Sequence, residues 1–328
     1  MKKNNILTAL FSLALLIITG CVEEMDIEPI DNSDRKLVID GLLSNEEPPY
    51  FFRVTLTAGF NEKSNIGVED AQLIISDNTG VKDTLQPLVS NFDHVNEGYP
   101  YFLRTFFNHY TQEQNVFPFN ISEDMVEASA GFYATNRIRG KEGNTYTLTV
   151  NYKGKTYEAT ETMPVATPID SLWFQYKDLK TKEGYFLCPI INFKNTPDKP
   201  DYYLFTYDKM DLASTISSPL RVWQISVLSD EYLPEEVKNF NLNDGETVRG
   251  YEEGFNFIFP EGYESSIYMH SITASCYTYF SDLIKQMRFD GGLYTPTPLT
   301  TRGNISNGAL GFFNVSAVSV KTEICVPK

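Results

Sequence analysis

Apolar and polar residues alternate with a period of two in segment 50–58 of the chain. Phe52 and Val54 fall on one side of an extended backbone, while Arg53 and Thr55 fall on the other. Such alternation is typical of an antiparallel strand that turns one face to a core and the other to water. The segment therefore predicts a sheet that covers hydrophobic side chains on one side only.

Similar short runs, each bounded by turn residues, recur up to residue 163. They are rich in β-branched and aromatic side chains, which favour strands. The sequence NYKG at 151–154 predicts a tight turn between two of them. Short strands at this spacing predict a β-sandwich over residues 36–163. Its expected strands are 36–43, 50–58, 71–76, 81–86, 145–150 and 155–160.

A second series of strands follows segment 163–168, which is punctuated by prolines and carries no helix signal. This composition predicts a domain boundary near Thr167 and a second β-sandwich over residues 169–328. Its expected strands are 171–176, 185–193, 202–207, 221–228, 251–259 and 266–272.

One helix interrupts this second series, at residues 276–287. Phe280, Leu283, Ile284 and Met287 recur at the spacing of one helix face and form an apolar stripe. The stripe predicts a helix that packs as a cover on a sheet; a helix that binds a partner is the alternative. The expected fold class is therefore mainly β, with two β-sandwich domains, immunoglobulin-like or transthyretin-like, and one short C-terminal cover helix.

A long insertion, residues 87–130, separates the strands of the first sandwich and shows no clear period. Long irregular loops are usually functional or disordered, and this one is too aromatic for disorder. It is the candidate recognition surface; the alternative is that its rings close over the sandwich edge or dock on the second domain. The candidate binding residues are Tyr99, Tyr101, Phe102, Phe106, Phe107 and Tyr110.

The N-terminus carries the pattern of a lipoprotein signal peptide over residues 1–20. Two lysines precede a short apolar run, which is too short to span a bilayer and ends in the box ITGC at 18–21. The thiol of Cys21 is nucleophilic enough to accept a diacylglyceryl group as a thioether. The sequence therefore predicts cleavage before Cys21 and anchoring of Cys21 by acyl chains such as palmitate.

Residues 21–35 are acidic and lack periodicity, so they predict a disordered tether between the anchor and the folded body. Acidic residues directly behind the lipidated cysteine also resemble a surface-export signal of Bacteroidota lipoproteins. The expected location is thus the outer membrane, with the body at the cell surface. A plain solvated spacer on a periplasm-facing protein is the alternative.

The net charge and the absence of known catalytic motifs limit the classes of function that we expect for this protein. The net charge of −16 repels phosphate backbones, so nucleic acid is not an expected partner. The chain contains no metalloprotease, hydrolase, dinucleotide or P-loop motif, and its three histidines, His94, His109 and His270, have no paired ligand motif. We therefore expect a protein that is not an enzyme and that uses no cofactor or metal.

Three cysteines remain after lipidation, and an oxidising envelope permits one disulfide among them. Cys276 and Cys325 are the candidate pair, because they flank the helix and the tail, and closing that loop would stabilise the C-terminal region. A bridge that includes Cys188 is the alternative.

Several short motifs together resemble a known family. They are LVIDG at 37–41, the Tyr- and Phe-rich helix, P-x-P at 296–298, N-I-x-N-G at 304–308 and GFF at 311–313. The chain is similar in these to Bacteroidota lipoproteins grouped as a domain of unknown function, number 4249. The resemblance implies an outer-membrane lipoprotein encoded near TonB-dependent receptors, and it supplies no catalytic residues.

Two functions are consistent with these features. The first is a non-catalytic, lipid-anchored binding or accessory protein of a TonB-dependent receptor system, which the anchor, the tether and the aromatic insertion favour. The second is an adhesive or structural module of the cell envelope.

Overall fold

The computed structural model confirms a mainly β protein with one α-helix near the C-terminal end of its described residues. No helix among these residues has the length and apolar character needed to cross a membrane. The described residues are 35–48, 50–58, 66–87, 104–108, 113–117, 131–135, 137–178, 185–196, 200–208, 226–242, 246–247, 259, 261–262, 264–287 and 301–328.

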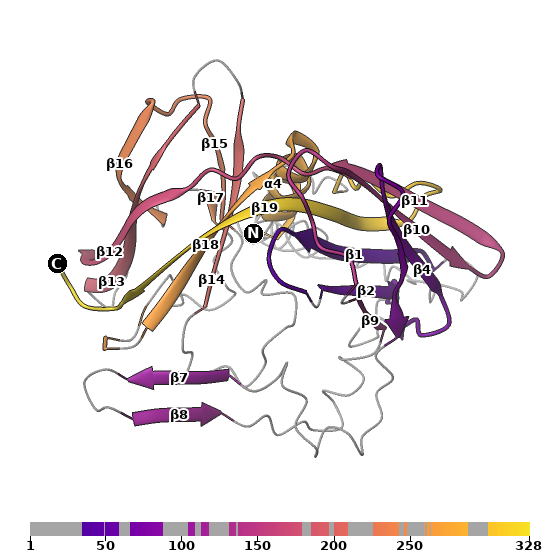
Figure 1. Cartoon of the computed structure of the whole chain (residues 1–328), viewed down its shortest axis with the longest axis horizontal. Coiled ribbons are helices and arrows are strands. Elements are labelled where there is room, and N and C mark those ends of the chain that lie inside the picture. The colour runs from indigo at the N-terminus through magenta and orange to yellow at the C-terminus, as the bar shows by residue number, and fades with distance from the viewer. Residues whose placement is uncertain are drawn as a thin grey trace, which may run out of the picture.

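A ten-stranded main sheet forms the middle of the molecule (Figure 1). It contains strands from both predicted domains. Its order is β17 (Glu246–Thr247), β15 (Ser226–Ser229), β14 (Tyr202–Asp208), β18 (Glu264–Ile272), β19 (Leu310–Ile324), β1 (Leu37–Ser44), β2 (Tyr50–Leu56), β9 (Phe132–Thr135) and β6 (Gln86–Pro87), with β3 (Ile66–Gly67) beside β2.

Three smaller sheets accompany the main sheet, and every pairing within them is antiparallel. The first is β11 (Lys155–Thr162), β10 (Thr145–Tyr152), β4 (Gln72–Asp77) and β5 (Lys82–Thr84); the second is β12 (Ile169–Asp178), β13 (Tyr185–Lys194) and β16 (Glu236–Asn241); the third is β7 (Arg104–Asn108) and β8 (Glu113–Phe117).

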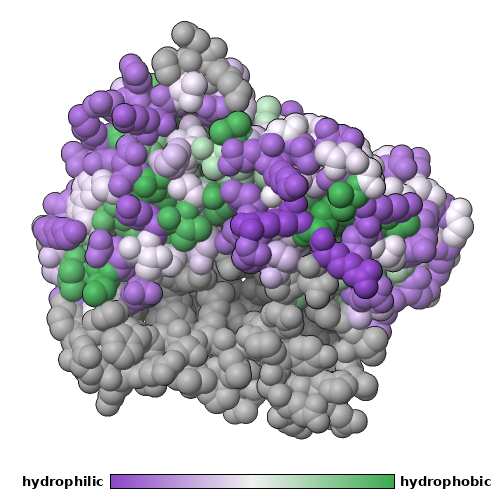
Figure 2. All heavy atoms as spheres, viewed as in Figure 1, coloured by the Kyte–Doolittle hydropathy of each residue, from purple (hydrophilic) through white to green (hydrophobic). Residues whose placement is uncertain are grey.

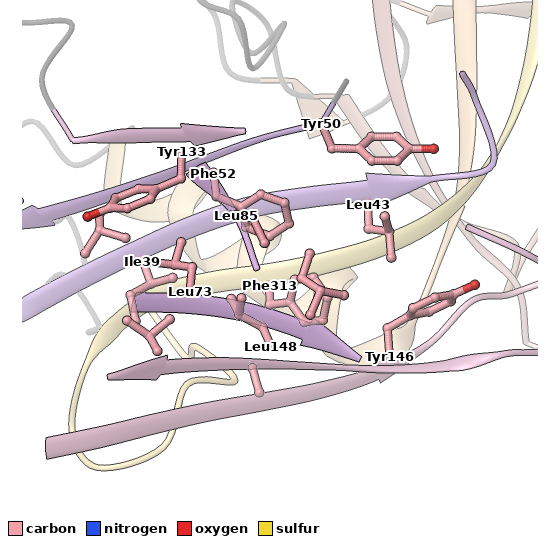
Figure 3. Packing of buried hydrophobic residues seen from close by; sticks show 14 of the residues in the cluster. Ile39, Leu43, Tyr50, Phe52, Leu73, Leu85, Tyr133, Tyr146, Leu148 and Phe313 are labelled. Carbon is pink, nitrogen blue, oxygen red and sulfur yellow. The ribbon is translucent and has the colours of Figure 1, made fainter. Parts of the chain in front are cut away.

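The first hydrophobic core lies between one half of the main sheet and the four-stranded sheet (Figure 3). The alternation predicted for segment 50–58 is confirmed, because Phe52 and Val54 on β2 are fully buried in this core. β19 adds Phe313, which is also fully buried and whose ring lies 6.0 Å from that of Phe52. The burial of each such side chain contributes about 1.5–3 kcal/mol to the stability of the folded state.

The second hydrophobic core lies between the three-stranded sheet β12-β13-β16 and the strands β14 and β18. Phe193 and Tyr203 meet there edge to face, with ring centroids 5.4 Å apart. The opposite face of the main sheet is covered by α4 (Ala274–Met287), which packs Ile284 and Cys276 against Leu204 and Phe312. The predicted cover helix at 276–287 is therefore confirmed, and it begins two residues earlier than expected.

The last strand joins the two halves of the chain. β19 pairs in parallel with β1 through residues 310–316 and antiparallel with β18 through residues 317–324. It contributes Phe313 to the first core and is followed by Cys325 in the second. Both sandwich-like packings thus share the main sheet, while the boundary near Thr167 stays a prediction.

β19 was not predicted from the sequence. Its residues 311–318 are buried on both faces, so the alternation that reveals a half-buried strand is missing. Other differences are smaller: the expected strand 81–86 is divided into β5 and β6, and the expected strand 221–228 is described only as β15. Of the expected strand 251–259, only Phe259 lies within the described residues, and it is not in a strand.

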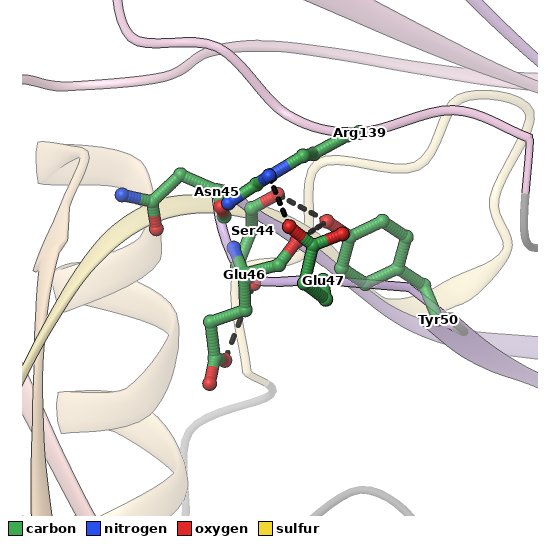
Figure 4. Close-up of polar contacts among 6 residues, drawn as sticks. All are labelled: Ser44, Asn45, Glu46, Glu47, Tyr50 and Arg139. Carbon is green, nitrogen blue, oxygen red and sulfur yellow. Dashed lines mark hydrogen bonds and ion pairs between the residues drawn. The ribbon is translucent and has the colours of Figure 1, made fainter.

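The connection between β1 and β2 is fixed by polar contacts (Figure 4). The single proton of the Tyr50 hydroxyl is shared between two carbonyl oxygens, that of Ser44 at 2.7 Å from the hydroxyl oxygen and that of Glu46. Arg139 donates through Nε to the Asn45 carbonyl at 2.8 Å and forms an ion pair with Glu47. These contacts hold the end of β1 at the point where β19 continues beyond it.

Gly311 permits the close approach of β19 to β1, and this gives a stability prediction. Gly311 has a φ of +94°, and an added Cβ would lie 2.1 Å from the Ile39 carbonyl oxygen. Gly311→Ala should therefore lower the free energy of unfolding by at least about 3 kcal/mol, because backbone strain and a backbone clash add together. Urea unfolding of the full chain in mild detergent measures this loss.

Gly80 is a matched control, since its φ is +93° and nothing lies within 4 Å of the added Cβ. Gly80→Ala should lower the free energy of unfolding by only about 1–2 kcal/mol, from backbone strain alone. Equal losses in the two variants would show that contact with β1 does not limit Gly311.

Candidate functional site

Most of the predicted binding residues lie outside the described part of the chain. These are Tyr99, Tyr101, Phe102 and Tyr110, together with the lipid-attachment residue Cys21. Phe106 and Phe107 lie on β7, of which the backbone alone is described. The recognition surface predicted for the insertion 87–130 therefore stays a prediction.

The cysteine pairing can be compared with the structure directly. Cys276 and Cys325 are buried free thiols, and Cys188 is buried as well. Cys276 belongs to α4 and packs in the apolar cluster between α4 and the main sheet, whereas Cys325 lies in the second core, so the two belong to separate apolar clusters. Burial raises the pKa of the Cys325 thiol to about 12, which keeps it protonated and unreactive. The predicted Cys276–Cys325 disulfide is not formed in this structure.

A charged cluster lies on the face of the main sheet that α4 covers. Asp40 on β1 stands opposite Arg53 on β2 and opposite Phe312 on β19. The hydroxyl of Tyr279, from α4, donates a hydrogen bond to the Asp40 carboxylate, and the Tyr279 ring stacks on Phe312 with centroids 5.0 Å apart. The Arg53 guanidinium lies 5.1 Å from the centre of the Phe132 ring. One carboxyl thus contacts groups from two neighbouring strands and the helix.

The surroundings of this cluster change its protonation. Loss of hydration raises the pKa of Asp40 to about 6, although the charge of Arg53 and hydrogen bonds from Phe312 and Tyr279 act in the opposite direction. Burial also raises the pKa of Tyr279, and the nearby Asp40 charge adds to that effect. Asp40 is therefore a carboxyl that gains a proton in mildly acidic solution, which is unusual for an aspartate.

Further polar groups share this face of the sheet. The buried His270 ring on β18 bonds through Nε2 to Thr206 at 3.1 Å and through Nδ1 to Ser316 at 3.0 Å. Both ring nitrogens of His270 therefore have partners within the sheet, while His94 and His109 lie outside the described residues.

Between Phe312 and Ser316, the side-chain oxygen of Asn314 is buried and has no hydrogen-bond partner among the described residues. Buried polar atoms are rarely left unpaired, so the described part of this face has hydrogen-bonding capacity that its own residues do not use. Among the described residues, no three His, Cys, Asp or Glu side chains lie close enough to hold a metal ion.

The N-I-x-N-G motif at 304–308 holds β19 in place through side-chain hydrogen bonds to the backbone. The Asn304 amide accepts from the Phe313 N–H at 2.9 Å and donates to the Phe313 carbonyl at 2.9 Å and to Glu161 at 3.0 Å. Asn307 adopts a left-handed backbone and donates to the Thr156 carbonyl on β11 at 2.6 Å. These bonds give both asparagines a structural role in holding β19.

Sequence reasoning missed the Asp40 cluster, although one signal was present. Asp40 interrupts the apolar run LVIDGLL at 37–43, and a charge inside a buried strand usually has a dedicated partner. Arg53 was predicted to face water, but its side chain is half-buried. It lies on the sheet face that α4 covers, where it contacts the Phe132 ring and where Tyr279 reaches down from the helix. As arranged, these groups link the sheet to the helix through a hydrogen bond that forms on a titratable carboxyl.

Asn304→Ala tests the fastening role. The substitution leaves both backbone groups of Phe313 and one Glu161 oxygen without their present partner, so the free energy of unfolding should fall by about 2–3 kcal/mol. Asn307→Gly keeps the left-handed backbone and removes one exposed hydrogen bond, and it should cost under about 1 kcal/mol. Urea unfolding compares the two, and a smaller loss for Asn304→Ala than for Asn307→Gly would contradict the role.

Comparisons with known proteins place the chain in a family. A search of curated proteins found no match. The family model described as "Domain of unknown function (DUF4249)" matches residues 22–322, which is nearly the whole chain and begins one residue after Cys21. This protein is therefore a member of the DUF4249 family.

Proposed function

We propose that this protein is a non-catalytic, lipid-anchored lipoprotein of the outer membrane, displayed at the cell surface, that acts as a binding or accessory protein of a TonB-dependent receptor system. The observation that carries the proposal is the box at 18–21 with its cysteine, directly before the residue at which the family match begins. A mature chain that starts at Cys21 would contain all of the matched segment.

The position of β1 supports anchoring through the N-terminus. The tether 21–35 leads directly into β1, which is paired on both sides, by β2 and by β19. A force applied through the anchor would therefore act on a strand that is hydrogen-bonded along both edges. An edge strand, which is bonded on one side alone, would separate from its sheet more easily. The acidic tether would separate the body from the bilayer.

The adhesive or structural alternative has an observation of its own. The outer face of the four-stranded sheet carries threonine pairs from β10 and β11, with Thr145 and Thr162 hydroxyls 2.8 Å apart and those of Thr147 and Thr160 2.9 Å apart. Such pairs stabilise a sheet, and they also present hydroxyls to a glycan. Figure 2 shows hydrophobic residues as separate patches among hydrophilic ones on the face in view.

Cys21→Ser tests the anchor. The serine hydroxyl does not accept the diacylglyceryl group, so the variant should fail to incorporate labelled palmitate and should leave the membrane fraction, because each buried acyl CH₂ contributes about 0.8 kcal/mol to membrane binding. Unchanged sedimentation of the variant with membranes would contradict the proposal.

Co-purification tests the partner. Tagged full-length protein, extracted in mild detergent, should retain a TonB-dependent receptor identified by mass spectrometry, and Cys21→Ser protein recovered from the soluble fraction serves as the control. Retention on glycan or matrix material without a receptor would support the adhesive alternative instead. Cleavage of the body by protease added to whole cells would support surface display.

A further inference from the structure

The contact between α4 and the main sheet contains one carboxyl that takes part in several interactions at once. Asp40 lies in the middle of the sheet, opposite Arg53 on one neighbouring strand and Phe312 on the other. Tyr279 reaches it from α4 and stacks on Phe312 in the same contact. Movement of α4 away from the sheet would therefore change the surroundings of Asp40 more than those of a residue inside either core.

Asp40 is the carboxyl in this contact whose pKa burial raises toward neutral pH. The ionisable side chains of Glu161 and of His270 on β18 also lie near α4 on this side of the sheet, and Glu161 accepts a hydrogen bond from Ser275 of α4. β2 supplies Arg53, which keeps its charge at ordinary pH. α4 supplies Tyr279 and Cys276, and the pKa of each is raised by burial, so both stay neutral. β19 supplies the backbone of Phe312, and β9 supplies the uncharged ring of Phe132 below Arg53.

The direction of the coupling follows from hydration. With α4 in place, the protein around Asp40 removes water from the carboxyl, and this cost falls on the ionised form. With α4 lifted, water returns and the ionised form regains its ordinary stability. Ionisation of Asp40 therefore favours the open arrangement, and protonation favours the closed one.

We propose that Asp40 is a proton-controlled latch that sets how often α4 opens from the main sheet. In mildly acidic surroundings the protonated carboxyl keeps α4 closed over Phe312, Leu204 and Ile272. As the pH rises through about 6, the pKa of Asp40 in the closed state, opening becomes more frequent and this apolar cluster is exposed more often. The latch does not depend on the lipid anchor or on a receptor.

Hydrogen–deuterium exchange of peptides from 274–287, in the full-length protein in mild detergent, measures the opening. After correction for the intrinsic exchange rate, the opening constant should be about tenfold larger at pH 7.5 than at pH 5.0, because the carboxyl has its ordinary pKa in the open state and a raised pKa in the closed state. Equal opening constants at the two pH values would overturn the proposal.

Variants assign the effect to the carboxyl. Asp40→Asn keeps the shape without the charge, so it should hold α4 closed equally at both pH values. Tyr279→Phe removes a hydrogen bond that favours ionised Asp40, so the pH dependence should persist and move to higher pH. Asp282→Asn, on the same helix, is the control, since hydrogen bonds from Arg302 hold the pKa of Asp282 low and outside this range.

The pattern across variants decides the outcome even if one of them folds poorly. A tenfold pH effect that survives in Asp40→Asn, or that disappears in Asp282→Asn, would assign the effect to another group and overturn the latch. An effect abolished by Asp40→Asn and shifted by Tyr279→Phe would support it.

Discussion

The architecture depends on satisfying the backbone hydrogen bonds of β19 along both of its edges. Each main partner covers only part of its length, since β1 pairs through residue 316 and β18 pairs from residue 317. Two asparagine side chains act where these partners are missing: Asn304 bonds both backbone groups of Phe313, and Asn45 bonds both backbone groups of Val318. A side-chain amide has the same donor and acceptor as a peptide group, so it can replace one residue of a strand.

Polar and apolar residues are divided between the two faces of the main sheet. The faces toward the two sandwich cores carry mainly apolar side chains. The face under α4 carries an apolar cluster, but beside it lie Asp40, His270 and the Asn314 oxygen, for which the described residues supply no hydrogen-bond donor. Buried polar groups of this kind add little stability and add specificity or sensitivity to conditions. The core faces therefore account for the fold, and the α4 face is the part of the described structure that can respond to its surroundings.

Sequence patterns predicted those features that depend on neighbouring residues. Segment 50–58 was recognised as a strand because one face is buried, and α4 because its stripe recurs every three to four residues. β19 was not predicted because it is buried on both faces and therefore shows no alternation of apolar and polar residues. The Asp40 cluster and the hydrogen bonds of the Asn45 amide were not predicted, for a different reason. Their partners are distant in sequence, and Asn45 and Val318 are 273 residues apart. No local pattern encodes such a contact.

The parallel pairing of β1 with β19 also constrains how the polypeptide can be made. The first folded strand must wait for nearly the last residues to emerge from the ribosome before its ladder can close, and both cores remain incomplete until then. Long-range pairing of this kind slows folding. Until residues 310–316 have been made, β1 can pair with β2 but not with β19, so the finished main sheet forms late relative to the synthesis of β1.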